Sequence, residues 1–273
     1  MSSSTLFHLF LLSSLLFSCL SYARLDADDF SYIEGSPNGP ENWGNLRPEW
    51  KTCGNGKEQS PICLCDDRVI RTLALGKLRT SYQAAYATVK NNGHDIMVNF
   101  KSDAGSQFIN QVQYQLKRIH FHSPSEHALN GERYDFEVQM VHESQDQRKA
   151  VTAILFRFGR SDPFLSNLED FISKISRHET NEVDAGVVDP SQLILQFDDP
   201  AYYRYMGSYT APPCTEDITW TVIKKLGTVS PRQVLMLKQA VNENSINNAR
   251  PLQSLKFRTV FFYPSQKSNH DAI

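Results

Sequence analysis

The stretch Arg118-Ile119-His120-Phe121-His122 decides how the rest of this chain can be interpreted. In a β-strand, alternate side chains lie on the same face, so His120 and His122 project together while Ile119 and Phe121 face the opposite way. Two imidazoles on one side of a strand can chelate a metal, and a neighbouring strand usually provides a third ligand. By itself the pattern is a weak signal, because two histidines that only pack or hydrogen-bond are at least as common.

The next predicted strand, Phe136–His142, offers candidates for that third ligand. One face of it carries Glu137, Gln139 and Val141, and the other face carries His142. If the first face is turned toward the two histidines, Gln139 occupies the third ligand position. His142 cannot replace it without a one-residue slip of register, which would turn every side chain of the strand over.

Strand-like segments dominate the remaining chain, and two helices have clear starts. A hairpin is indicated where Asn91-Asn92-Gly93 separates two alternating stretches. One helix is predicted from Pro163 through Ile175, and another from Pro231 through Ala240. We expect strands over residues 84–88, 96–100, 114–122, 134–142, 151–158, 218–223 and 259–263. Many strands with few helices, not in alternation, predict a mostly β fold built on one large sheet.

The N-terminus predicts entry into the secretory pathway. An apolar run from Leu6 to Leu20 ends in Ser21-Tyr22-Ala23, whose small first and last residues fit a signal-peptidase site. We therefore expect a signal peptide over residues 1–23 and a single domain over residues 24–273. A buried N-terminal helix or an anchor is the alternative, although the run is short for a membrane span. Whether the protein ends in the vacuole or outside the cell stays open.

Charge excludes some classes of partner. The formal net charge is -2, and lysines and arginines are spread along the chain, so we expect no nucleic-acid binding and no membrane attachment. The sequence leaves the oligomeric state open between a monomer and a weak dimer.

Secretion also changes how the cysteines are interpreted. Without residues 1–23, Cys53, Cys63, Cys65 and Cys214 remain, an even number in an oxidising compartment. Cys63 and Cys65 are two residues apart, which in a strand is poor geometry for a bond between them. We expect buried free thiols, with an intermolecular link or a strained redox-active pair as alternatives.

Several motifs in the right order resemble the α-carbonic anhydrase family across the whole chain after residue 23. They are residues 56–62, residues 120–127 (His-Phe-His-Ser-Pro-Ser-Glu-His), residues 207–214 (Gly-Ser-Tyr-Thr-Ala-Pro-Pro-Cys), Trp220 and residues 248–253. The resemblance implies a mainly β (α+β) fold with one large twisted, mostly antiparallel central sheet and peripheral short helices.

The resemblance also implies roles for individual residues. His120 and His122 match two zinc ligands, and Glu126 matches a buried carboxylate that accepts a hydrogen bond from the hydroxyl of Thr210. His94 matches a proton-shuttle histidine near the cavity mouth. The remaining matches are Val141, Val151, Tyr209 and Ala211 in the substrate pocket, Gln59 and Glu137 behind the ligands, and a Cys53–Cys214 disulfide. Closing that long loop would stabilise the fold by roughly 4–5 kcal/mol.

The chain departs from the family at the third ligand, where the family has histidine and this chain has Gln139. A neutral amide oxygen is a poorer partner for zinc than an imidazole. Losing a side chain that only supports a ligand costs about 10–100-fold in metal affinity, so losing a ligand should cost at least as much. We expect zinc to bind weakly or not at all.

A closer resemblance suggests what such a chain does. Residues 32–44, 141–147 and 240–244 resemble the dioscorins, tuber storage proteins that share this fold. The first hypothesis is therefore a storage protein on a disabled enzyme scaffold with at most weak hydration of carbon dioxide. The alternatives are a working zinc carbonic anhydrase acting on carbon dioxide and bicarbonate, or an ascorbate-linked redox role in which the vacant cavity binds an ascorbate-like anion.

Overall fold

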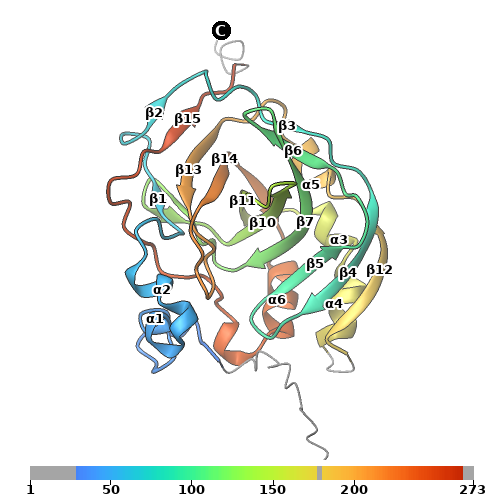
Figure 1. Cartoon of the computed structure of the whole chain (residues 1–273). Coiled ribbons are helices and arrows are strands. Elements are labelled where there is room, and N and C mark those ends of the chain that lie inside the picture. Colours follow the sequence, from blue (N-terminus) through green and yellow to red (C-terminus); the bar gives the residue numbers. More distant parts are fainter. Residues whose placement is uncertain (1–28, 177–179, 267–273) are drawn as a thin grey trace, which may run out of the picture.

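Alternating apolar residues build a large twisted sheet at the centre of the structure, with short helices at its periphery (Figure 1). The computed structural model describes residues 29–176 and 180–266, so the expected signal peptide lies outside the described residues. Within these residues the larger sheet has 12 strands, with β12-β4-β5-β7-β10-β11-β14-β13-β15-β2 in order, β6 beside β7, and β3 beside β6. Its neighbours are antiparallel except for the β11–β14 and β15–β2 pairs, which confirms the predicted fold class.

The bounds of the elements are as follows. The strands are β1 (Cys63–Leu64), β2 (Ile70–Arg71), β3 (Arg79–Thr80), β4 (Ala85–Asn91), β5 (Ile96–Phe100), β6 (Ser106–Ile109), β7 (Val112–His122), β8 (Ala128–Leu129), β9 (Glu132–Arg133), β10 (Phe136–Ser144), β11 (Lys149–Phe158), β12 (Glu182–Val188), β13 (Tyr202–Gly207), β14 (Ile218–Val229) and β15 (Phe261–Tyr263). The helices are α1 (Trp43–Leu46), α2 (Thr52–Asn55), α3 (Pro163–Ser166), α4 (Glu169–Ser176), α5 (Gln192–Leu195) and α6 (Pro231–Ala240), with 3₁₀ turns at Pro48–Trp50 and Glu243–Ser245. Strands β1, β8 and β9 form a separate small sheet.

The predicted strands are present, and the hairpin expected around residues 91–93 joins β4 to β5. The structure adds strands that the pattern did not indicate. The edge strand β12 is one of them. Its pairing with β4 shifts register between Asp184 and Gly186, and this irregularity interrupts the apolar–polar alternation that would have indicated a strand.

The single helix predicted from Pro163 through Ile175 is wrong, because the structure divides it into α3 and α4. The chain leaves the first helix at Asn167, whose side-chain amide donates to Gln192 at the start of α5. At this point the backbone N–H of Leu168 donates to Leu165, three residues back rather than four, and both leucines are fully buried in the core. The helix α6 begins as predicted, with a capping box between Ser230 and Gln233.

Two hydrophobic clusters lie on opposite faces of the central strands. Ile119, Phe121, Val138 and Met140 belong to the larger cluster, which α4 and α6 cover. Val141 belongs to the second cluster, on the face that also carries the predicted site. Among the described residues, no helix is both long and apolar enough to cross a membrane.

Candidate functional site

The pairing of β7 with β10 brings the predicted ligand residues together. His120 lies opposite Gln139, and His122 lies opposite Glu137, so the predicted register and the shared face are both confirmed. His142 is buried on the opposite face, where its Nε2 lies 2.7 Å from the hydroxyl of Tyr82.

Both ring nitrogens of His120 are already engaged. Its Nδ1 lies 2.5 Å from the carboxylate of Asp95, and the Nε of Arg118 lies 2.9 Å from its Nε2. A guanidinium only donates, so Nε2 is the acceptor and the ring proton is on Nδ1, facing Asp95. Burial opposes ionisation of Asp95, but the electrostatic interaction and the hydrogen bond with the adjacent His120 ring lower the pKa of that carboxyl below its usual value.

His122 has one nitrogen free of a close partner. Its Nδ1 donates to the backbone carbonyl of Asn248 at 2.8 Å, which fixes the ring. Its Nε2 lies 3.8 Å from Glu126. Burial favours the neutral ring, but the carboxylates of Glu126 and Asp95 raise the pKa of His122 above its ordinary value.

Gln139 is held by two buried carboxylates. Its amide nitrogen donates to Glu126 at 2.7 Å and to Glu137 at 2.9 Å. Both carboxylates are fully buried, so these charge-assisted hydrogen bonds fix the orientation of the amide.

Glu137 is the centre of a buried hydrogen-bond network. It accepts hydrogen bonds from the backbone and the ring of His127, and the other nitrogen of that ring lies 2.7 Å from the hydroxyl of Tyr205. Burial alone would raise the pKa of Glu137, but His127 lowers it to about 2. The prediction that Glu137 supports the third ligand position is consistent with its contact with Gln139, and His127 takes part in the core network rather than lying in the pocket.

Two expectations, the Glu126–Thr210 hydrogen bond and the position of His94, are not met in the described part of the chain. No hydrogen bond joins Glu126 to Thr210, because the carboxylate instead accepts from Gln139 and from the backbone of Arg250. His94 does not lie at a cavity mouth: it is buried, its ring is stacked on Phe30 with centroids 3.8 Å apart, and its Nδ1 lies 3.0 Å from Ser245.

The expected pocket wall is partly assembled. Val141 and Val151 are buried and lie opposite each other in β10 and β11. Tyr209 packs against the same cluster, with the Arg118 guanidinium 5.8 Å from its ring centre. Ala211 packs instead against the cluster that contains Cys53 and Cys214.

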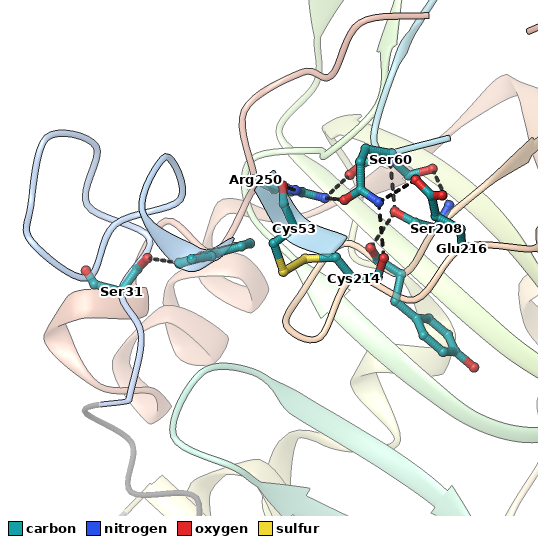
Figure 2. The surroundings of a disulfide bond; sticks show 10 residues. Ser31, Cys53, Ser60, Ser208, Cys214, Glu216 and Arg250 are labelled. Atoms are coloured by element: carbon teal, nitrogen blue, oxygen red, sulfur yellow. Dashed lines mark hydrogen bonds between the residues drawn. A yellow bond between two sulfur atoms is a disulfide. The ribbon is translucent and has the colours of Figure 1, made fainter. Parts of the chain in front are cut away.

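The disulfide between Cys53 and Cys214 is confirmed, with an S–S distance of 2.09 Å. Figure 2 shows Arg250 beside it: the guanidinium donates to the carbonyl oxygens of Cys53 and Ser60 and to the side chain of Gln59. Gln59 therefore lies in the network around the disulfide rather than behind the ligands. Burial lowers the pKa of Arg250 to about 10, and the charge of Glu126 opposes this.

Cys63 and Cys65 differ from the expectation of buried thiols. Both are half-buried and unbonded, and their sulfur atoms are 2.9 Å apart, close enough for a hydrogen bond between the thiols.

Sequence reasoning missed Asp95, Arg118 and Arg250 as parts of the site. A signal for Arg118 was present, because it shares the strand face of His120 and His122 by the same alternation. Asp95 and Arg250 lie in connecting segments, where no periodicity indicates which way a side chain points. Among the described residues, no group of three or more His, Cys, Asp or Glu side chains is arranged to hold a metal ion.

Comparisons with known proteins place this geometry in a family context. Residues 38–264 match the family model of the eukaryotic-type carbonic anhydrases. Over all 273 residues of both chains the sequence is 90% identical to dioscorin DB3L of Dioscorea polystachya, and 69% identical to dioscorin dioA3 of Dioscorea japonica. It is 42% identical to alpha carbonic anhydrase 7 of Arabidopsis thaliana over 94% of each chain.

Solved structures of a dioscorin and of an α-carbonic anhydrase also match the fold of this chain. A crystal structure of dioscorin complexed with ascorbate matches with a TM-score of 0.85 and 69% identity, covering 88% of this chain and 99% of that one. The α-carbonic anhydrase of Thermovibrio ammonificans, in complex with the inhibitor sulfanilamide, matches with a TM-score of 0.74 and 32% identity, over 85% of this chain and 98% of that one.

Proposed function

We propose, from the premise that this chain belongs to the eukaryotic-type carbonic anhydrase family, that it is a tuber storage protein whose zinc site binds metal weakly or not at all. The similarity to dioscorins over the full length supports the storage role. The family ordinarily uses zinc to lower the pKa of a bound water. The question is whether the residues of this chain fit that ion.

The observation that carries the proposal is the position of Gln139 between Glu126 and Glu137. Its amide nitrogen donates to both carboxylates, so the side chain is oriented by the protein and has only its carbonyl oxygen to offer a metal. An amide oxygen is a harder and weaker donor for zinc than the imidazole that the family has there. The third ligand position therefore carries an atom that binds zinc more weakly than the histidine nitrogen of the family.

Arg118 weakens the site further. Zinc would need the lone pair of His120 Nε2, which accepts a hydrogen bond from Arg118. The guanidinium of Arg118 must move away from this nitrogen before zinc can bind there. The nitrogen of His120 is therefore not available to the metal either. Of the two histidines, His122 keeps one nitrogen without a hydrogen bond, since its Nε2 lies 3.8 Å from Glu126. This donor set does not fit a tight zinc site.

Retention of Glu126 and Glu137 does not require catalysis. Both are fully buried and hydrogen-bonded to backbone groups, so removing either would leave buried donors unsatisfied. Their presence fits a structural role in a scaffold that has lost its metal.

Stopped-flow hydration of carbon dioxide tests the proposal. We expect the purified protein to stay near the uncatalysed rate and to gain at most weak activity with excess zinc. A working carbonic anhydrase is the alternative function, and high turnover without added zinc would establish it in place of this proposal.

We also propose that the site formed by His120, His122 and Gln139 binds a small anion of the ascorbate type, because the guanidinium of Arg118 lies against His120 and supplies a positive charge there. A similar dioscorin has been solved with ascorbate, which supports this class of ligand. Isothermal titration with ascorbate should show binding that Arg118→Gln weakens by about 10–150-fold, the value of one hydrogen bond to a charged group. An ascorbate-linked redox role would further require oxidation of the bound ligand, and unchanged affinity in Arg118→Gln would remove the site from consideration.

The remaining proposals concern processing and location. We propose cleavage after Ala23, a single domain from residue 24 to residue 273, and storage in the vacuole or outside the cell. N-terminal sequencing of the purified tuber protein should begin at Arg24, and a sequence beginning at Met1 would contradict secretion.

A further inference from the structure

Cys63 and Cys65 are two reactive groups that the proposed function does not use. They flank Leu64 in β1, which pairs in parallel with β8. Leu64 is fully buried, whereas both cysteines are half-exposed and their sulfur atoms are 2.9 Å apart. Alternate residues of an extended segment point the same way, so both thiols project from the side opposite Leu64.

The thiols open on a small cavity. Its volume is about 130 Å³, and besides the two cysteines it is lined by Arg68, Gln253 and three apolar side chains, Val69, Leu255 and Val260. Water takes about 30 Å³ per molecule, so the space admits the sulfur-bearing end of a small molecule. Arg68 is the charged residue of the lining, which favours a ligand with carboxylates.

The segment that carries the thiols is fixed on both sides. Leu64 packs in the second core cluster, and the backbone of Arg68 donates to the carbonyl of Cys65 at 2.9 Å. Asp66 is held by Lys224 at 2.7 Å and by the hydroxyl of Tyr203 at 2.6 Å. The proximity of the two sulfur atoms therefore belongs to the fold rather than to a freely moving loop.

We propose that Cys63 and Cys65 form a reversible dithiol–disulfide pair that exchanges with small anionic disulfides entering this cavity. Cys63, as a thiolate, attacks one sulfur of the disulfide, forms a mixed disulfide and releases the first thiolate. Cys65, deprotonated in turn, attacks the sulfur of Cys63, forms the Cys63–Cys65 bond and releases the second. The protein loses two electrons and two protons, and the small disulfide becomes two thiols.

The order of the two steps follows from the hydrogen bond between the thiols. This bond, together with partial burial, raises the pKa of Cys65 to about 11. Cys65 therefore keeps its proton more readily than an ordinary thiol, which assigns the first attack to Cys63.

Geometry favours a labile bond over a permanent one. Residues two apart in an extended chain have Cα atoms about 6.6 Å apart, near the upper limit of about 6.8 Å for disulfides. A bond formed near that limit between two partly exposed cysteines is more easily reduced than a buried, relaxed structural disulfide. The buried Cys53–Cys214 bridge is the structural counterpart in the same chain.

Equilibration of the purified protein with reduced and oxidised glutathione tests this proposal. After acid quenching and maleimide labelling, peptide mapping reads Cys63 and Cys65 separately from the other cysteines. We expect both to lose their label together as an intramolecular disulfide, and Cys65→Ser to accumulate a glutathione adduct on Cys63. The proposal would be overturned if maleimide still labelled both thiols at every ratio of reduced to oxidised glutathione. Glutathione adducts on both cysteines of the unmodified protein would overturn it as well.

A second measurement tests the role of Arg68. Arg68→Gln should slow exchange with anionic oxidised glutathione about threefold or more, and leave exchange with the neutral hydroxyethyl disulfide unchanged. Equal rates with both reagents would contradict an anionic partner. Neither result depends on the zinc site, so this proposal can fail while the proposed function stands, and the reverse.

Discussion

Two substitutions should rebuild the zinc site in steps. Gln139→His restores the third imidazole and should raise zinc affinity at least 10–100-fold, which is about 1.4–2.7 kcal/mol. Arg118→Gln releases Nε2 of His120 from a hydrogen bond of 2.9 Å to a charged donor. Such a bond is worth about 1.5–3 kcal/mol, or roughly 10–150-fold in affinity.

The double variant should therefore bind zinc about 10²–10⁴-fold more tightly than the unmodified chain, and the two effects need not add because both act on one ion. Competition with a chromophoric chelator measures these affinities. Arg148→Gln, an exposed site paired with Asp146, serves as the matched control and should change nothing.

Two outcomes would refute this reasoning. If the unmodified chain binds zinc as tightly as Gln139→His, the amide is not the weak donor. If Arg118→Gln has no effect in the Gln139→His background, its bond to His120 does not compete with the metal.

Two further predictions concern stability. The Cys53–Cys214 bridge spans 161 residues, so replacing both cysteines by serine should lower the free energy of unfolding by about 5 kcal/mol in denaturant titrations, and a loss below about 1 kcal/mol would contradict the loop-entropy argument. Burial lowers the pKa of His142 from 6.5 to about 4, so the unfolded chain binds this proton first. About 3 kcal/mol of stability, present above pH 6.5, should be lost as the pH falls from 6.5 to 4. His142→Gln should flatten this part of the profile, and an identical slope in the variant would show that His142 is not responsible.

Periodicity predicted the parts of the site that lie on strands. His120, His122 and Gln139 share a face because the pairing of β7 with β10 keeps its register from Glu137 to Val141, and the register shift comes only after Val141. The same argument, applied to Arg118, would have identified the side chain that donates a hydrogen bond to Nε2 of His120. Arginine is not a metal ligand, so the sequence pattern of a metal site does not point to it.

Connecting segments were less predictable. His94 was expected near a cavity mouth, but its ring is buried between Phe30, on which it stacks, and Ser245, which lies 3.0 Å from its Nδ1. Gln59 was expected behind the ligands, yet Arg250 draws it into the network around the disulfide. The Phe30–His94 contact joins residues 64 positions apart, and the Arg250–Gln59 contact joins residues 191 positions apart, so no local pattern encodes either one.

The helix predicted from Pro163 has apolar spacing that continues through Ile175, but the structure ends α3 at Ser166 and begins α4 at Glu169. Between them the N–H of Leu168 bonds to Leu165, three residues back, which interrupts the α-helical ladder. Leu165, Leu168, Ile172 and Ile175 are all buried, so the apolar pattern identified the core-facing residues but not the turn among them.

Zinc stoichiometry of the purified protein tests the central claim most directly. The protein is dialysed against buffer without chelator, and zinc is measured by atomic absorption beside the Gln139→His variant. The account predicts a value near zero for the unmodified chain and a higher one for the variant. One zinc per chain in the unmodified protein would contradict it, because Gln139 and Arg118 would then be compatible with an intact metal site.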